Sequence, residues 1–537
     1  MTVGDSRNEA HPGQGLTREE LLRRGAAAGG VLVAGGMLAG TAGVAAAAAP
    51  KKGGVFKIGV EGGSAKDFID GQNIIQKLDI SRLVATFEGL SYFDENYKPV
   101  NSLAEELTAE KPNQWLIRVR DGIEFHNGKT LGADDVIYSL KRTLNAKLGL
   151  FGHSGFTAID PKGIKKLDKR TVRLVLSRPN VTLIDAFSQY FQGIVPVGYC
   201  PNNGNGKGPL QYIGTGAFKV KSFTPGRESV HVRNPNYWRT GQPYFDEVHI
   251  IDFPDATARV NALLGGQVHA ITGVPLAQVP LVQKRSGLKI YEAPTGAWDP
   301  ILMRVDTAPF TDVRVRQAFK MLANRPQMVA QVLSGHGRVG NDIFGPLDQC
   351  YAGDEFPQRK YDPEQAKSLL KAAGQEGLTI DFNTTDEDVG MVGGAQIFAE
   401  NAKAAGVTIN VKQLDSGTFY GDNYLKWTLS SDFWGTRNYL AQVALSNLPD
   451  STYNESHFNN AKYISLSKQA GGTVDLNKRC ELIKEMQKIS YDEGGEIIPF
   501  FKNLVDAHST KIGGLKLDRG TLDLNKYGNG FRTIYFV

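Results

Sequence analysis

The sequence lacks the short motifs that mark common catalytic and nucleotide-binding sites. It contains no H-E-x-x-H zinc motif, no G-x-S-x-G nucleophile elbow and no G-x-x-x-x-G-K-[ST] phosphate loop. A G-x-G-x-x-G match at residues 335–340 follows a predicted helix and runs into a loop, whereas a dinucleotide site lies between a strand and a helix. Ser465 and Lys468 match Ser-x-x-Lys, but the Lys-Thr-Gly partner is missing. These absences argue against an enzyme, and we expect no cofactor.

The sequence also has few cysteines and only a small excess of positive over negative charge. Three widely spaced cysteines, Cys200, Cys350 and Cys480, form no C-x-x-C pair in 537 residues. Their odd number leaves at least one thiol unpaired within the chain, and the sequence does not assign a disulfide. His and Cys do not cluster at ligand spacings, so we expect no metal site. The net charge is only +5, and the basic run at 165–178 alternates with Val and Leu as on a solvated hairpin, so we expect no nucleic-acid partner.

The first 50 residues predict a cleaved export signal. Arg18, Arg23 and Arg24 precede a Gly/Ala-rich run at 25–49, which offers several A-x-A cleavage sites before Pro50. The run is long enough to cross a bilayer, but its Gly and Ala make it weakly apolar, which favours removal over a retained anchor. The arginines only approximate a twin-arginine signal, so the export route stays open. No cysteine lies near the cleavage region, and we therefore expect a periplasmic protein without a lipid anchor.

The remaining chain has the pattern of an α/β protein. Glycines lead into a strand at 53–60, a second strand is predicted at 115–120, and Asp134 and Asp135 suit the positive end of a helix that begins there. After Pro294 helices and strands alternate, which is typical of an α/β lobe. In this part we expect strands at 301–305, 378–383, 407–414, 497–501 and 531–537, and helices at 312–333, 363–373, 392–405 and 476–493.

Four signatures at fixed offsets carry a family resemblance. The most specific lies in residues 212–254, with a Gly-Thr-Gly turn from Gly214, an Asn-Pro-x-Tyr-Trp knot ending at Trp238 and a Gly-x-Pro turn ending at Pro243. The others are Leu-Ala-Glu with a glycine-bounded turn and an Ala-Asp-Asp-Val helix start in 100–144, Pro-Phe-x-Asp-x-Arg-Val-Arg-Gln-Ala at 309–318, and Tyr-Asp-Pro-x-x-Ala-Lys at 361–367. Together they resemble the solute-binding proteins of peptide-type ABC importers (family 5), and the resemblance spans nearly everything after residue 50.

This resemblance implies a two-lobed periplasmic-binding-protein fold of type II, with an extra subdomain inserted in lobe I and a cleft between the lobes. Two chain crossings would form the hinge, and the protein would be a monomer. The implied divisions are an export signal at 1–50, lobe I at 51–98, 208–293 and 512–537, the inserted subdomain at 99–207, and lobe II at 294–511.

The resemblance also implies a function in capture rather than catalysis. The lobes would close around a short peptide or a peptide-like, partly anionic solute and deliver it to a membrane permease served by separate ATPase subunits. A rival cargo is an opine-like conjugate or a metal chelate. Rivals of other classes are an exported hydrolase and a surface receptor or chaperone that delivers nothing to a permease.

One departure from the family pattern concerns the ligand directly. Peptide-binding relatives hold the α-ammonium of the ligand with an aspartate in a Trp-x-x-Asp-Tyr segment, and here Trp434 is kept while Arg437 stands at the aspartate position. Arginine repels an ammonium group but can grip a carboxylate or a phosphate with two hydrogen bonds. Alternatively, Arg437 pairs with a nearby acid such as Asp432 and only shapes the pocket. The candidate residues here are Trp434, Gly435, Thr436, Arg437 and Asn438.

Further candidates for the cleft follow from their family positions. They are Glu61 after the first strand, Trp298, Asp299 and Arg304 on the segment entering lobe II, and Phe419 and Tyr420 before the Trp434 segment. The tryptophans can stack on an apolar or cyclic ligand part, although a single aromatic is more often a core residue. Asp299 could supply a partner for a cationic group.

Overall fold

The computed structural model describes residues 50–74, 77–199, 212–520, 523–525 and 530–537. The predicted export signal, apart from Pro50, and Cys200 therefore lie outside the described residues.

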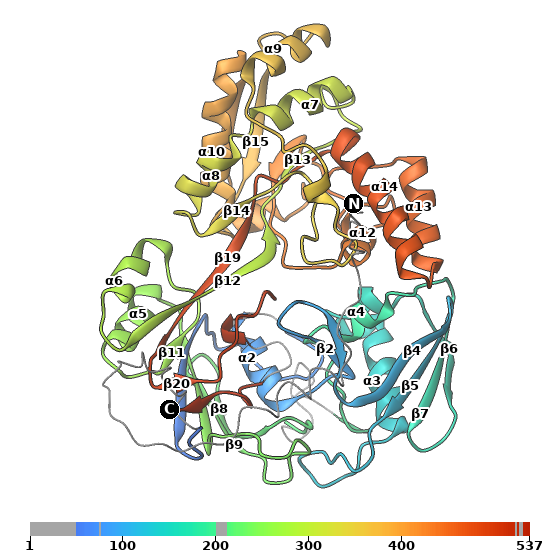
Figure 1. The fold of residues 1–537 in the computed structure, drawn as a ribbon, viewed down its shortest axis with the longest axis vertical. Coiled ribbons are helices and arrows are strands. Elements are labelled where there is room, and N and C mark those ends of the chain that lie inside the picture. Colours follow the sequence, from blue (N-terminus) through green and yellow to red (C-terminus); the bar gives the residue numbers. More distant parts are fainter. Residues whose placement is uncertain (1–49, 75–76, 200–211, 521–522, 526–529) are drawn as a thin grey trace, which may run out of the picture. The chain divides into compact units, whose positions relative to one another are not determined.

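The largest sheet combines strands from distant parts of the chain (Figure 1). Its strand order is β12-β19-β11-β1-β10-β9-β8, and β14 pairs with β19. The strands are β1 (Val55–Glu61), β8 (Phe218–Thr224), β9 (Glu228–Arg233), β10 (Glu247–Phe253), β11 (Ala270–Ile271), β12 (Leu288–Trp298), β14 (Gly337–Val339) and β19 (Phe500–Ser509). β1 is parallel to β10 and β11, and the other neighbours are antiparallel. Phe56, Ile58 and Val60 alternate along β1 into the core, as the period of a strand requires.

A second, four-stranded antiparallel sheet has the order β4-β5-β7-β6. Its elements and neighbours are β2 (Ser91–Phe93), β3 (Pro99–Asn101), β4 (Ala104–Lys111), β5 (Gln114–Val119), β6 (Ile159–Lys166), β7 (Thr171–Leu176), α3 (Ala133–Leu144) and α4 (Leu183–Phe187). The expected start of α3 is confirmed, because Asp135 accepts a hydrogen bond from the amide of Gly132 (3.0 Å). The basic run forms the β6–β7 hairpin, as predicted.

A third, five-stranded sheet has the order β16-β15-β17-β13-β18. Its strands are β13 (Ile301–Met303), β15 (Thr379–Thr384), β16 (Thr408–Gln413), β17 (Leu429–Ser431) and β18 (Glu496–Ile497). The helices of this part are α7 (Val313–Leu322), α8 (Arg325–Val332), α9 (Pro363–Ala372), α10 (Met391–Ala402), α11 (Ser416–Phe419), α12 (Tyr439–Ser446), α13 (Ala461–Gly472) and α14 (Leu476–Glu493). Phe319, Phe382 and Phe398 meet in a core between the sheet and α7 and α10.

The remaining elements are short. They are α2 (Lys77–Thr86), α5 (Ala256–Leu264), α6 (Val279–Gln283), β20 (Ile512–Gly513), β21 (Tyr535–Phe536) and the 3-10 turns η1 (Ala146–Leu148), η2 (His153–Phe156), η3 (Leu276–Gln278), η4 (Gly353–Glu355), η5 (Lys403–Ala405) and η6 (Asp523–Asn525).

The alternating elements between 301 and 414 are confirmed to within three residues, with one exception. The single helix expected at 312–333 is wrong, because α7 ends at Leu322 and α8 begins at Arg325. Pro326 explains the break, since in a continuous helix its ring would clash with the carbonyl of Leu322 and it has no N–H to donate. Asn324 caps the new helix by accepting from the amide of Gln327 (3.3 Å).

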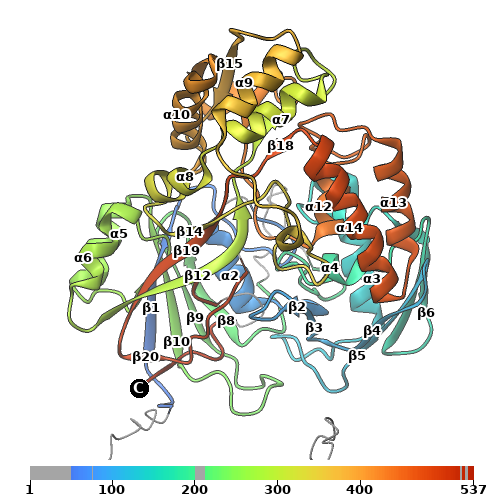
Figure 2. The same cartoon turned by 45° about the horizontal axis from the view of Figure 1, so that its top comes forward.

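The C-terminal strands also differ from expectation. The strand predicted at 497–501 is split between β18 and the much longer β19, and the strand predicted at 531–537 is only the two-residue β21. The sequence analysis did not anticipate β12, which pairs with β19 from Leu288–Ser509 to Trp298–Phe501. Both figures show these two strands side by side on the way from the large sheet to the elements after residue 300 (Figures 1 and 2).

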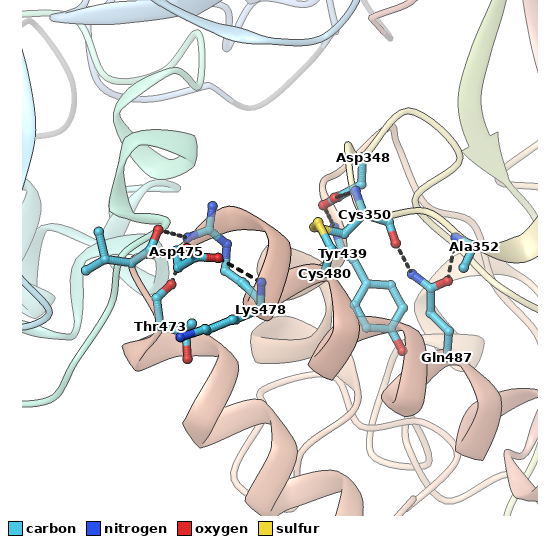
Figure 3. The surroundings of a disulfide bond; sticks show 11 residues. Asp348, Cys350, Ala352, Tyr439, Thr473, Asp475, Lys478, Cys480 and Gln487 are labelled. Carbon is cyan, nitrogen blue, oxygen red and sulfur yellow. Dashed lines mark hydrogen bonds between the residues drawn. A yellow bond between two sulfur atoms is a disulfide. The ribbon is translucent and has the colours of Figure 1, made fainter.

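Cys350 and Cys480 form a disulfide that closes a loop with a sequence separation of 130 (Figure 3). It ties the segment before η4 to the first turns of α14. Nearby, the side chain of Gln487 donates to the carbonyl of Cys350 (3.2 Å) and accepts from the amide of Ala352 (2.8 Å). Covalent and hydrogen-bonded links therefore fix the same stretch of chain to one helix.

Removing this disulfide should destabilise the fold. A Cys350→Ala/Cys480→Ala double variant should lose roughly 2–5 kcal/mol of unfolding free energy, because the unfolded chain regains the freedom of a long loop. Urea unfolding followed by circular dichroism measures the change. Equal midpoints for the double variant and the wild type would contradict the stabilising role.

Candidate ligand-binding site

The segment from Trp434 to Asn438 connects the end of β17 to α12 and is fixed at its first residue by Trp298. The two tryptophans exchange backbone hydrogen bonds, with the amide of Trp298 donating to Trp434 (3.0 Å) and the amide of Trp434 donating to Trp298 (2.8 Å). Their rings stack with centroids 6.4 Å apart. Trp298 is the last residue of β12, so this contact attaches the segment to the end of a strand of the large sheet.

Two further contacts hold the rest of the segment. The amide of Gly296 donates to Thr436 Oγ1 (3.0 Å), and the approach is so close that a Cβ at position 296 would lie 3.1 Å from Thr436 Cγ2. A side chain there would push the strands apart. At the far end, the amide of Tyr439 donates to the carboxylate of Asp348 (2.7 Å), which also accepts from the amide of Cys350 (2.7 Å; Figure 3).

Residues from the first 200 positions contact this segment, and we call this region of contact the seam. The hydroxyl of Tyr97 donates to the carbonyl oxygen of Thr436 (2.6 Å). The side-chain amide of Asn438 donates to Asp185 Oδ1 (3.0 Å) from 253 residues away in sequence. Asp185 lies in α4, next to the four-stranded sheet, whereas Thr436 and Asn438 follow the five-stranded sheet. Polar contacts therefore join the two parts of the molecule here.

Arg437 carries a charge at this seam that no acid neutralises. Its Nε is buried without a hydrogen-bond partner, and the guanidinium forms no ion pair with any carboxylate of the described residues. Its nearest electrostatic partners are tyrosines: burial raises the pKa of Tyr97 and of Tyr190, and the charge of Arg437 acts against that rise in both. Both phenols stay neutral at ordinary pH, so they can hydrogen-bond but cannot neutralise Arg437.

The pairing of Arg437 with Asp432 is not formed. The carboxylate of Asp432 instead accepts hydrogen bonds from the hydroxyls of Tyr420 (2.9 Å) and Tyr424 (3.0 Å). The alternative in which Arg437 only shapes the pocket by pairing with this acid therefore finds no support in the geometry.

The other candidates have partners elsewhere. Asp299 forms an ion pair with Lys502, which also pairs with Asp388. The position beside Asp299 where we expected a ligand cation is therefore occupied by this lysine. Arg304 pairs with Asp306 (2.8 Å). Phe419 is buried against Tyr420 and Trp427. Glu61 ends β1, where its amide donates to Thr272 (3.3 Å).

The contacts thus gather Trp298 with the Trp434–Asn438 segment. They leave the other five candidates with other partners, which for Tyr420 is Asp432. They add Tyr97, Asp185, Tyr190 and Asp348, none of which the sequence analysis identified. These four residues lie in no motif and are brought to the seam by tertiary contacts alone.

Asp185 is the acid whose ionisation the seam disturbs most. Burial raises its pKa, and the nearby charge of Asp348 raises it further, to about 7. The hydrogen bond from Asn438 and the charge of Arg479 act in the opposite direction. The carboxyl is therefore partly protonated near neutral pH.

The described residues lack two features that would point to other functions. They contain no group of three or more His, Cys, Asp or Glu side chains placed to hold a metal ion. None of their helices is long and apolar enough to cross a membrane.

Comparison with known proteins places this chain in a family. Residues 98–458 match the family of bacterial extracellular solute-binding proteins, family 5 (middle region), which is well over half of the chain. The chain therefore belongs to the family 5 extracellular solute-binding proteins, and its fold is the two-lobed α/β fold of that family. The resemblance seen in the sequence is confirmed.

Individual relatives agree with this assignment. The dipeptide-binding protein of Escherichia coli (strain K12) is 25% identical over 453 residues, which cover 78% of this chain and 84% of the relative. The glutathione-binding protein GsiB of the same strain is 24% identical over 443 residues, covering 80% and 85%. In fold, the chain is similar to the binding protein AgaA of A. tumefaciens R10 in complex with agropinic acid (TM-score 0.74, 22% identity, 90% of this chain and 99% of that one). The relatives compared are named as binding proteins.

The raised pKa of Asp185 predicts a pH-dependent stability. Its folded pKa of about 7 lies above the usual aspartate pKa of 3.8, so its favourable contribution to stability is complete below about pH 4 and is lost as the pH rises through about 7. The ligand-free Asp185→Asn variant, which can still accept from Asn438, should match the wild type at pH 4 and exceed it by about 2–4 kcal/mol at pH 8.

Urea unfolding at pH 4 and pH 8 measures the difference in unfolding free energy between the variant and the wild type. Groups far from Asp185 titrate alike in both proteins, so their contributions cancel in this difference. Asp121→Asn makes the same chemical change at an exposed position and should leave the pH profile unaltered. A constant offset between Asp185→Asn and the wild type from pH 4 to pH 8 would contradict the raised pKa.

Proposed function

We propose that this protein is the exported substrate-binding component of an ABC importer that captures a short peptide or a peptide-like solute carrying an anionic group. The observation that carries the anionic part of the proposal is Arg437, a half-buried arginine whose Nε is buried without a hydrogen-bond partner and whose guanidinium pairs with no carboxylate of the described residues. Burying a charge is costly unless a charge of opposite sign accompanies it. A carboxylate of the ligand, gripped by two parallel hydrogen bonds, would provide that partner.

The scaffold suits such capture. Arg437 lies between Thr436 and Asn438, and both of these make hydrogen bonds to the other side of the seam. A ligand held at Arg437 would therefore be enclosed when these contacts form and would be released when they break. Closure of two lobes around a small solute is the known way in which binding proteins of this architecture exclude water.

The hinge would consist of β12 and β19. These antiparallel strands are the two segments that lead from the large sheet to the elements after residue 300. On this basis we keep lobe I at 51–98, 208–293 and 512–537, the inserted subdomain at 99–207 and lobe II at 294–511. Residues 1–50 would direct export and be removed, leaving a periplasmic monomer.

The cargo class rests on charge and on the compared proteins together. Those proteins are named for a dipeptide and for glutathione, and one is described in complex with agropinic acid. A peptide and an acidic conjugate of the opine type both satisfy the requirement of Arg437 for an anion. In either case the protein would bind its ligand without converting it, and a separate permease with its own ATPases would carry out import.

Native mass spectrometry of the purified protein can identify a ligand retained from the expressing cell. Small-angle X-ray scattering with and without that ligand should show a smaller radius of gyration in the bound state. Conversion of the ligand by the isolated protein would instead support an exported hydrolase.

Substituting Arg437 should remove the preference for an acid. We expect the wild type to bind the dipeptide Ala-Glu more tightly than its analogue Ala-Gln-amide, which keeps the ammonium group but lacks both carboxylates. Arg437→Gln should weaken Ala-Glu binding at least tenfold, about 1.4 kcal/mol, while changing Ala-Gln-amide binding little. Isothermal titration calorimetry measures both affinities.

The control for this experiment is Arg314→Gln, which removes an exposed arginine paired with Asp312. It should behave as the wild type does. An Arg437→Gln protein that binds both peptides with wild-type affinities would exclude a direct contact between Arg437 and the ligand.

A further inference from the structure

A cavity of about 110 Å³ lies at the seam, beside the segment that carries Arg437. Residues from both sides line it, and those that matter for its chemistry are Tyr97, Lys98, Asp185, Asp348, Asn438 and Arg479. Arg437 itself does not line the cavity, so the space is separate from the guanidinium. Asn438 connects the two, because it follows Arg437 in the chain and donates to Asp185.

The cavity presents hydrogen-bond acceptors that lack donors. Asp185 is only 6% exposed, and its Oδ1 accepts from Asn438 while its Oδ2 has no donor among the described residues. The side-chain oxygen of Asn438 is also buried without a partner. Acceptors buried without donors are costly, and a ligand ammonium group would bring three N–H donors to them.

The charges around the cavity favour a cation beside Asp185. Both oxygens of Asp348 are held by backbone amides of Cys350 and Tyr439, which fixes a second negative charge near the first. Arg479 also lines the cavity, and its charge lowers the pKa of both acids. It forms no ion pair with either acid, however, and donates instead to the carbonyl oxygens of Thr473 (2.9 Å) and Val474 (3.2 Å).

The other titratable residues that line the cavity do not place a positive charge against Asp185. Lys98 is exposed, and Tyr97 is a neutral phenol that already donates to Thr436. The raised pKa of Asp185 fits this picture, since the free protein takes up a proton where an ammonium group would otherwise lie.

We propose that this cavity binds the ammonium group of the ligand at Asp185, so that the solute is a zwitterion whose anionic end lies at Arg437. The placement of the anionic end at Arg437 rests on the proposed function. The placement of the ammonium group does not, because the hydrogen-bond acceptors of the cavity are independent of Arg437. It narrows the substrate class to compounds that carry both a primary amine and an acid, such as unblocked acidic peptides or amino-acid conjugates.

The first experiment compares Ala-Glu with N-acetyl-Ala-Glu by isothermal titration calorimetry at pH 7.5. The wild type should bind the free amine at least tenfold more tightly than the acetylated peptide. Asp185→Asn keeps the acceptor for Asn438 but removes the charge, and should reduce this ratio to less than threefold. Asp121→Asn should keep the wild-type ratio.

The second experiment tests the cavity without a peptide, by thermal unfolding in n-propylammonium chloride and in potassium chloride at equal ionic strength. Propylammonium should raise the melting temperature of the wild type above its value in potassium chloride, and the difference should vanish in Asp185→Asn. An equal effect of both salts would mean an adventitious cation or a cavity filled only by water, and would overturn the inference.

The two experiments separate failure of this inference from failure of the proposed function. If Ala-Glu does not bind at all but propylammonium stabilises the wild type through Asp185, the ammonium site stands and the peptide cargo is wrong. If Ala-Glu binds through Arg437 but acetylation has no effect that depends on Asp185, the proposed function stands and the ammonium site is wrong.

Discussion

A half-buried positive charge without a carboxylate partner among the described residues is the constraint on which the proposed ligand site depends. Arg437 lies where Tyr97 and Tyr190 approach from the other side of the seam, and burial keeps both phenols neutral. In a protein interior a guanidinium usually has a carboxylate beside it, because the loss of hydration is otherwise uncompensated. Here the surroundings orient the charge without cancelling it. In the proposed function, this charge is the one that an anionic ligand would pair with.

The segment that carries this charge is rigid because its anchors come from different elements. Trp298 fixes it to the end of β12 by two backbone hydrogen bonds, and Asp348 fixes the start of α12. Across the seam the contacts at Thr436 and Asn438 are hydrogen bonds. A seam held by polar contacts can separate at modest cost, because each hydrogen bond lost to water is worth only about 1 kcal/mol. The geometry therefore suits the proposed function, in which an anchored segment would bind the ligand and the polar contacts across the seam would open and close.

Most of the fold could be predicted from the sequence, whereas only part of the site could. The helices and strands between 301 and 414 follow from hydrophobic periodicity, and the family signatures implied two lobes. The long helix was mispredicted because the apolar period continues past Pro326, and the clash of a proline ring with the preceding turn outweighs that period. Arg437 was identifiable since it stands at a recognisable position of a motif. Asp185 and Tyr97 were not, because their role depends on contacts made hundreds of residues away in sequence, which no local pattern records.

The disulfide has a consequence beyond holding a loop closed. Cys350 lies two residues after Asp348, and the same carboxylate connects the amide of Cys350 to the amide of Tyr439. The covalent bond to Cys480 is thus coupled, through one side chain, to the residue that follows Arg437 and Asn438. Opening the disulfide would therefore release the stretch of chain that bears Asp348, and with it one anchor of the start of α12.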